Sequence, residues 1–251
     1  MDLFDKLRID GASVIGASHQ SRRRNNQDAW SVARDRHAVV AAVADGSSSG
    51  PCSEVGARLA ARFLAAQGLV GMRTPGAEHL PLAQQLLSRL VDELGRLADE
   101  LTAPGEERAL TIADLFLFTV LMLFVDRERY SIIGVGDGLY GIDERLVSLA
   151  GHEGGQPTYC MYAHIDPADV GRPVDTRPRL HTTGITSDVT SLMIATDGCA
   201  QLMPSVDDSR PWHERFDIRG QRSSLLQTRV ESLVAESGPP YDDATLVWMR
   251  R

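Results

Sequence analysis

The chain has 251 residues, of which 43% are hydrophobic and 24% are charged, and its formal net charge is −8. This composition predicts a soluble globular protein with a substantial core. The acidic balance disfavours a nucleic-acid partner, because that function needs a basic face. The length suits one domain over residues 1–251, with a flap-like loop at about 151–178.

The cysteines and the apolar runs indicate in which cellular compartment the protein is expected. Cys52, Cys160 and Cys199 have no C-x-x-C spacing, which is typical of reduced thiols in a reducing compartment. The first residues lack the basic-then-apolar order of a signal peptide. The longest apolar run, Leu115 to Val125, is shorter than the ~20 residues of a membrane helix. We therefore expect a cytoplasmic protein with no membrane partner.

Hydrophobic periodicity in the first hundred residues predicts three strands and two helices. The strands are expected at Ser13 to Ser18, Trp30 to Arg34 and His37 to Ala44, and the helices at Glu54 to Gln67 and Leu82 to Leu101. In the second helix, leucines recur at three- and four-residue steps. That stripe favours core packing over a partner-binding zipper, because it is too short for a sustained coiled coil.

Strands dominate the rest of the chain. They are expected at Leu115 to Val125, Tyr130 to Val135, Leu139 to Ile142, Ser191 to Thr196 and Ala244 to Met249. A helix is expected at Gln221 to Glu236, and a long loop at Gly151 to Pro178 with a short strand at Tyr159 to His164. Because the strands cluster and do not alternate strictly with helices, the order favours an α+β layered sandwich.

Four aspartates occupy similar places at strand ends. Asp45, Asp137 and Asp197 each follow an apolar strand and precede glycine, and Asp242 directly precedes a strand. A single Asp-Gly pair is more often a turn than a ligand. The ends of neighbouring strands can converge, however, and four like charges there would repel unless cations neutralised them. Carboxylate oxygens without paired His or Cys suit Mg²⁺ or Mn²⁺. The spacing therefore predicts a Mg/Mn site.

Five motifs resemble those of the type 2C family of metal-dependent protein phosphatases and follow that family's order. They are Arg23-Arg24-Asn25-Asn26-Gln27-Asp28, Val43-Ala44-Asp45-Gly46 with Glu54 beyond it, Gly136-Asp137-Gly138, Thr196-Asp197-Gly198 and Asp242-Asp243-Ala244-Thr245. Gly16-Ala17-Ser18-His19 is similar to the G-x-S-H opening of a bacterial subgroup. The resemblance implies a four-layer α-β-β-α sandwich with two central antiparallel sheets. It also implies hydrolysis of phosphoserine and phosphothreonine in proteins.

The resemblance implies a role for each acid. Asp45 would bridge two core Mg²⁺ or Mn²⁺ ions, and the Gly46 carbonyl would bind one of them. Asp197 and Asp242 would complete the shell of the first ion. Asp137, together with Asp197, would bind a third and looser ion. A water activated by the two core ions would then attack phosphorus in line, without a phosphoenzyme.

The other implied roles concern the phosphate. Asp28 would support the metal-bound waters, and Arg23 would clamp the phosphate through a bidentate contact, with Arg22 and Arg24 as alternatives. The implied partners are a phosphorylated protein substrate and a cognate kinase. Substrate choice is expected to depend on the Gly151 to Pro178 segment.

The sequence departs from the family pattern at Gly50, which stands where the family usually has a histidine that is a candidate proton donor to the leaving alcohol. Loss of that donor could slow hydrolysis of alkyl phosphates by roughly 10²–10⁴. His19 is an alternative donor. Asp243, in place of the usual Asn, adds charge beside a ligand. Two other hypotheses therefore stay open: a catalytically weakened binding module, and a hydrolase of small phosphate metabolites.

Overall fold

The computed structural model describes residues 7–149, 156–203, 211–216 and 225–251. The first part of the expected flap-like loop and the first residues of the helix expected at 221–236 lie outside these ranges. None of the helices in the described ranges is both long enough and apolar enough to cross a membrane.

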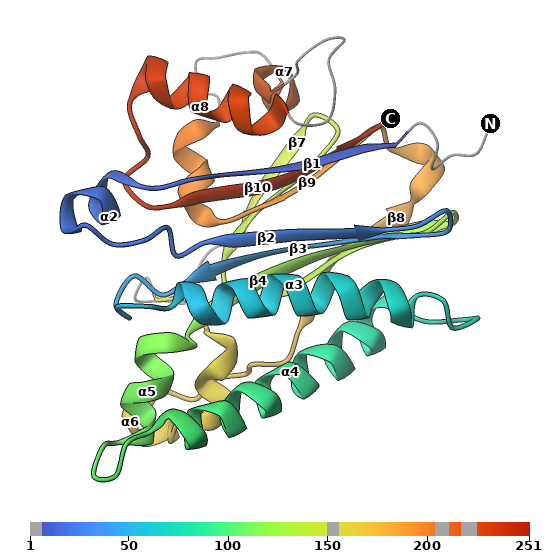
Figure 1. The fold of residues 1–251 in the computed structure, drawn as a ribbon. Helices are drawn as coiled ribbons and strands as arrows, with labels where there is room; N and C mark the ends of the chain where they lie inside the picture. The colour runs from blue at the N-terminus through green and yellow to red at the C-terminus, as the bar shows by residue number, and fades with distance from the viewer. Residues whose placement is uncertain (1–6, 150–155, 204–210, 217–224) are drawn as a thin grey trace.

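Two five-stranded antiparallel sheets lie face to face within the described ranges (Figure 1). The first sheet has the order β1 (Arg8–Val14), β10 (Ala244–Arg250), β9 (Ser191–Ala195), β6 (Gly138–Ile142) and β7 (Arg145–Leu149). The second has the order β2 (Ala29–Arg34), β3 (Val39–Gly46), β4 (Phe118–Val125), β5 (Arg129–Val135) and β8 (Arg179–Ile185). Every strand pairing in both sheets is antiparallel.

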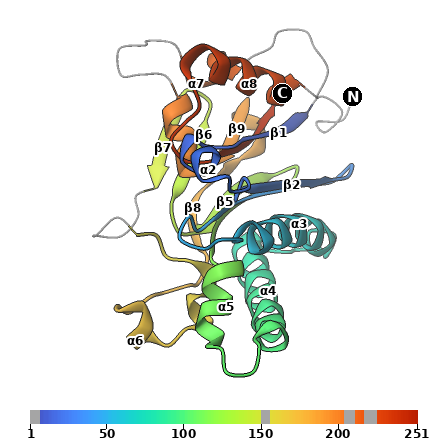
Figure 2. The ribbon, with the colours of Figure 1, turned by 60° about the vertical axis from the view of Figure 1, so that its left-hand side comes forward.

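Helices cover the outer faces of both sheets, which confirms the four-layer α-β-β-α sandwich (Figures 1 and 2). On the second sheet lie α3 (Glu54–Gly71), α4 (His79–Leu101) and α5 (Arg108–Leu115), and on the first lie α7 (Trp212–Phe216) and α8 (Leu225–Ser237). The short elements are α2 (Ala17–Arg22), α6 (Pro167–Val170) and the 3-10 turns η1 (Cys160–His164), η2 (Thr186–Asp188) and η3 (Asp197–Leu202).

The core follows the two-residue period of the strands. All eight residues of β4 are buried, as expected for a strand that is covered on both faces. Met122 and Phe124 pack with the α3–α4 layer, whereas Leu121 and Leu123 pack in the cluster between the two sheets. A third cluster, around Trp248, lies between the first sheet and α8.

Three of the predicted elements need correction. The strand expected at Ser13 to Ser18 is β1, which ends at Val14 in antiparallel pairing with β10, and the chain then turns into α2. The segment at Tyr159 to His164 is the 3-10 turn η1 and not a strand. Leu115 ends α5, so the central strand begins only at Phe118.

The strand order brings the predicted acids to the same end of the sandwich. Asp45 is the second-to-last residue of β3, Asp137 follows β5, and Asp197 follows β9. Asp28 precedes β2, and Asp242 lies two residues before β10. Because neighbouring antiparallel strands run in opposite directions, the end of one strand lies beside the start of the next.

Candidate metal and phosphate site

Asp45 lies at the centre of a group of carboxylates. Burial raises its pKa well above the usual range, and the negative charges of Asp28, Asp197, Asp242 and Asp137 raise it further. The strand-end acids predicted from sequence, together with Asp28, therefore lie close enough to repel one another. Carboxyls in such an arrangement need either protons or cations to neutralise their charges.

The outer members of the group show the same effect. Burial, followed by the charge of Asp197, raises the pKa of Asp137 to about 6. Burial and the charge of Asp242 raise the pKa of Asp197. The donor set is all oxygen, which fits a hard divalent cation.

Asp28 directly precedes β2 and is hydrogen bonded to Thr196, which directly follows β9, so it links the two sheets. Its Oδ2 accepts a hydrogen bond of 2.7 Å from the Thr196 hydroxyl, which itself accepts one of 2.9 Å from the Thr245 N–H. Burial raises the pKa of Asp28, and the charges of Asp243 and Asp242 add to the rise, while the Thr196 hydrogen bond lowers it. Asp28 is thus fixed in place beside the strand-end acids.

Gly46 and the loop after it pack tightly. A Cβ at Gly46 would lie 2.6 Å from the Gln27 carbonyl, so no side chain fits there. At Gly50 a Cβ would lie 2.4 Å from the Ala113 carbonyl oxygen. The position where the family has histidine therefore has no room for one in this loop conformation.

The three arginines have different surroundings. Arg24 donates to the carbonyls of Ser48 and Gly50, at 2.5 and 3.4 Å. Arg22 and Arg23 are exposed at the end of α2, and Arg23 takes a left-handed backbone conformation with φ of 55°. Arg24 thus holds the loop after Gly46, and Arg22 and Arg23 stay available to a ligand.

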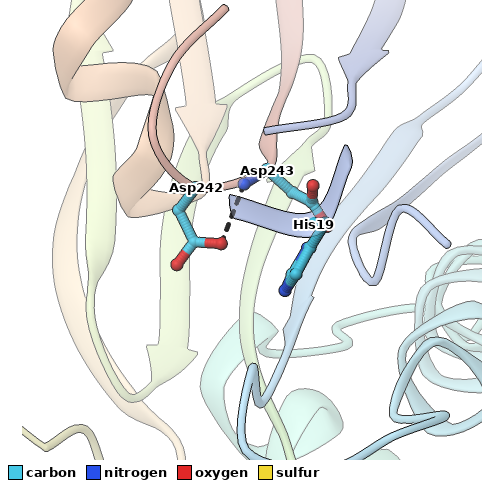
Figure 3. A group of neighbouring side chains, drawn as sticks. All are labelled: His19, Asp242 and Asp243. Carbon is cyan, nitrogen blue, oxygen red and sulfur yellow. Dashed lines mark hydrogen bonds and ion pairs between the residues drawn. The ribbon is translucent and has the colours of Figure 1, made fainter. Parts of the chain in front are cut away.

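His19, Asp242 and Asp243 form a close group of ligand-type atoms in the described ranges (Figure 3). One atom from each of His19, Asp242 and Asp243 lies within 4.8 Å of the others. His19 Nδ1 lies 2.7 Å from Asp243 Oδ2, and the imidazole is only 1% exposed. Asp243 also accepts the N–H groups of Gly16 and Gln27. Its carboxylate is thus occupied by hydrogen-bond donors, which makes it a poor metal ligand.

Two side chains near the site add to the predicted set. Glu54 begins α3 and accepts a hydrogen bond of 2.7 Å from Asn25. The Tyr159 hydroxyl is hydrogen bonded to Ser47, and the charges of Asp45 and Asp137 help burial to raise the pKa of Tyr159 to about 12. Sequence reasoning missed Tyr159, because a lone tyrosine in a Gly- and Pro-rich segment carries no motif.

Comparisons with known proteins identify the family and the fold. The family model described as "Protein phosphatase 2C" matches residues 15–234. Among solved structures, the serine/threonine phosphatase Stp1 from Staphylococcus aureus is 14% identical, with a TM-score of 0.65 over 100% of this chain and 97% of that one. The Mycobacterium tuberculosis phosphatase PstP/Ppp is 16% identical, with a TM-score of 0.60 over 97% and 98% of the two chains.

A further solved structure carries metal. The catalytic domain of PstP in complex with two manganese ions is 18% identical to this chain, with a TM-score of 0.59 over 97% of each chain. At these identities the likeness establishes the fold. The comparison with curated proteins gave no significant match.

Proposed function

Because this chain belongs to the protein phosphatase 2C family, we propose that it is a Mg²⁺- or Mn²⁺-dependent phosphatase of phosphoserine and phosphothreonine in proteins. The observation that carries the proposal is the convergence of four other acids on Asp45, with the pKa of that carboxyl raised by burial and by their charges. Like-charged carboxyls held this close together destabilise the fold in the absence of a cation, and such groups are typical of functional sites. A phosphoprotein, and the kinase that phosphorylates it, are the implied partners.

The ligand roles follow the acids' places in the group. Asp45 would bridge two core ions, with the Gly46 carbonyl on one of them, and Asp197 and Asp242 would complete the first ion's shell. Asp137, whose neighbour is Asp197, would contribute to a weaker third position. When bound, the ions would supply a water of lowered pKa and would neutralise charge on the phosphate. The PstP structure with two manganese ions supports a two-ion core.

The remaining roles belong to the chain itself. Arg23 would clamp the phosphate through two parallel hydrogen bonds, with Arg22 as the nearest substitute. Arg24 would instead hold the loop at Ser48 and Gly50 in the arrangement that the site needs. Asp28, fixed by Thr196, would orient the waters around the ions from outside their shell.

The structure also supports a second candidate function, that of a catalytically weakened phosphatase-like module that binds phosphoproteins. The supporting observation is the leaving-group side of the site. Gly50 has no room for a side chain, and the His19 imidazole is almost fully buried. Neither position would then protonate an alkyl leaving group, which would affect phosphoserine and phosphothreonine far more than aryl phosphates.

Phosphate release from an aryl phosphate and from a phosphothreonine peptide, with Mn²⁺ or with a chelator, separates these functions. Metal-dependent turnover of both substrates supports the phosphatase. Turnover of the aryl phosphate alone, with the peptide bound but not hydrolysed, supports the weakened module. No metal-dependent turnover of either substrate would reject the enzymatic function.

A further inference from the structure

The Asp243 carboxylate collects hydrogen bonds from three points of the N-terminal segment. Its Oδ1 accepts the Gly16 N–H at 2.7 Å. Its Oδ2 accepts the Gln27 N–H at 2.6 Å and lies 2.7 Å from His19 Nδ1. Hydrogen bonds to a buried carboxylate are stronger than those between neutral groups. One C-terminal side chain therefore fixes the segment that enters α2 and the segment that leaves it.

The backbone of the same region completes the junction. Ala17 N–H donates to the Pro240 carbonyl at 2.8 Å, and Ser18 N–H donates to the Tyr241 carbonyl at 3.0 Å. A Cβ at Gly16 would lie 2.3 Å from the Asp242 carbonyl carbon, so the N-terminal and C-terminal segments are in direct backbone contact here. The start of α2 is thus docked on the turn that carries Asp242.

Asp243 also acts on the neighbouring acid. Its backbone N–H donates a hydrogen bond of 2.9 Å to Asp242 Oδ1, and Figure 3 shows this bond with the His19 imidazole against the Asp243 side chain. The carboxylate of Asp242 and the start of α2 are therefore held by two groups of a single residue.

Only one nitrogen of the His19 imidazole takes part in the contact with Asp243. Because Nδ1 faces a carboxylate, the hydrogen resides on Nδ1. Nε2 is buried and has no hydrogen-bond partner among the described residues. A buried nitrogen without a partner costs stability. The useful property of His19 is therefore the Nδ1 hydrogen bond.

We propose that His19 and Asp243 form a positioning pair that holds α2, and with it Arg23, in register with Asp242. The pair would present the phosphate-binding arginine and the metal-binding carboxylate as one unit. Partners behind the ligands of a metal commonly change its affinity 10–100-fold when they are removed. This inference rests on the proposed function, because it assigns metal and phosphate to the two sides of the junction.

The test compares His19→Asn with His19→Gln. The amide nitrogen of asparagine can take the place of Nδ1, whereas that of glutamine reaches the place of Nε2. We expect His19→Gln to lower Mn²⁺ affinity, measured by calorimetry, roughly 10–100-fold and to raise KM for an aryl phosphate. His19→Asn should keep both values close to wild type. If His19→Gln does not fold, His19→Ala, which also removes the Nδ1 donor, serves as the second variant, with the same losses expected.

Asp143→Asn is the matched control. The Asp143 carboxylate likewise accepts three hydrogen bonds, from Thr190 N–H, the Thr190 hydroxyl and Ser191 N–H, at the end of β9 remote from Asp197. This variant should lower the unfolding temperature without changing Mn²⁺ affinity or KM. A merely structural role for the His19–Asp243 pair would give the same pattern.

Three results would overturn the positioning pair. One is wild-type Mn²⁺ affinity and KM in His19→Gln, and another is an equal loss in His19→Asn. The third is unchanged Mn²⁺ affinity with selective loss of alkyl-phosphate turnover, which would make His19 a proton donor. If wild type binds Mn²⁺ but hydrolyses no phosphate ester, the proposed function fails while the calorimetric comparison still decides on the pair.

Discussion

The Thr196 hydroxyl lies 2.7 Å from Asp28 Oδ2 and donates a hydrogen bond that ties the end of β9 to the start of β2. Thr196 directly follows β9 and Asp28 directly precedes β2, and these strands belong to different sheets, so the bond crosses the sandwich at the acidic end. It also places Asp28 beside the residue that precedes Asp197.

Thr196→Val removes this bond while it keeps the shape of the side chain. The variant removes one of the donors to a buried carboxyl, which we expect to cost about 1–3 kcal/mol of unfolding free energy. Denaturant unfolding with a chelator present measures the loss. Thr196→Ser keeps the hydroxyl and is the control, so an equal loss in both variants would show that the hydrogen bond is not the cause.

Asp197→Asn should raise the stability of the metal-free protein and lower its metal-dependent activity. Removing one negative charge from a group of mutually repelling acids relieves that repulsion, so the metal-free variant should be more stable than wild type, by on the order of 1 kcal/mol. Mn²⁺-dependent hydrolysis of an aryl phosphate should fall at least roughly 100-fold. Unfolding in chelator and initial rates in Mn²⁺ are the two measurements. A less stable variant with full activity would contradict both expectations.

The pH dependence of stability should depend on metal. The pKa of Asp137 is raised from 3.8 to about 6 in the fold, so the folded state binds that proton more tightly than the unfolded state. Its stabilising contribution is full below pH of about 4 and is lost as pH rises through about 6. Metal-free protein should therefore unfold more readily at pH 8 than at pH 5, and Asp137→Asn should reduce the difference.

Mn²⁺ should reverse this trend, because metal binding favours the deprotonated carboxylates. Unfolding free energies at the two pH values, with chelator and with Mn²⁺, provide the check. Equal stability of the metal-free protein at both values would contradict the raised pKa.

Gly50→His should not restore the function of the histidine that the family usually has at this position. The added Cβ would approach the Ala113 carbonyl to 2.4 Å, so the loop must shift or the protein must lose stability. We expect a loss of about 1–3 kcal/mol and no gain in the ratio of alkyl- to aryl-phosphate turnover. Ser48→His, at an exposed position of the same loop, is the control. A stable Gly50→His protein with improved peptide turnover would contradict the packing account.

Substitution of Arg23 should affect substrate binding, whereas substitution of Arg24 should affect stability. Arg23→Lys should raise KM for aryl phosphate with little change in stability, because an ammonium group cannot reproduce a bidentate contact. Arg24→Lys should instead lower the unfolding free energy by about 0.5–1.5 kcal/mol through weaker hydrogen bonds to Ser48 and Gly50. Steady-state kinetics and denaturant unfolding of both variants give the comparison, and the reverse pattern would assign the phosphate to Arg24.

The parts of the fold that could be predicted from sequence are those with a local signal. β4 is a continuous apolar run, and Asp45, Asp137 and Asp197 follow apolar strands at Asp-Gly pairs. β8 lies at a sheet edge and consists of exposed and half-buried residues without a buried one, so its apolar pattern is too weak to identify it. The His19–Asp243 contact joins residues 224 positions apart, and no local pattern reports such a pair.

The most direct test of the central claim is a calorimetric titration of Mn²⁺ into metal-free wild type and Asp45→Asn, with Asp175→Asn as a control. Asp175 pairs with Arg177 and Arg179 and is absent from the charges that act most on Asp45. If the acids around Asp45 form one metal site, wild type and Asp175→Asn will bind at least two ions, and Asp45→Asn will lose affinity at least roughly 100-fold. Equal Mn²⁺ binding by wild type and Asp45→Asn would contradict the account.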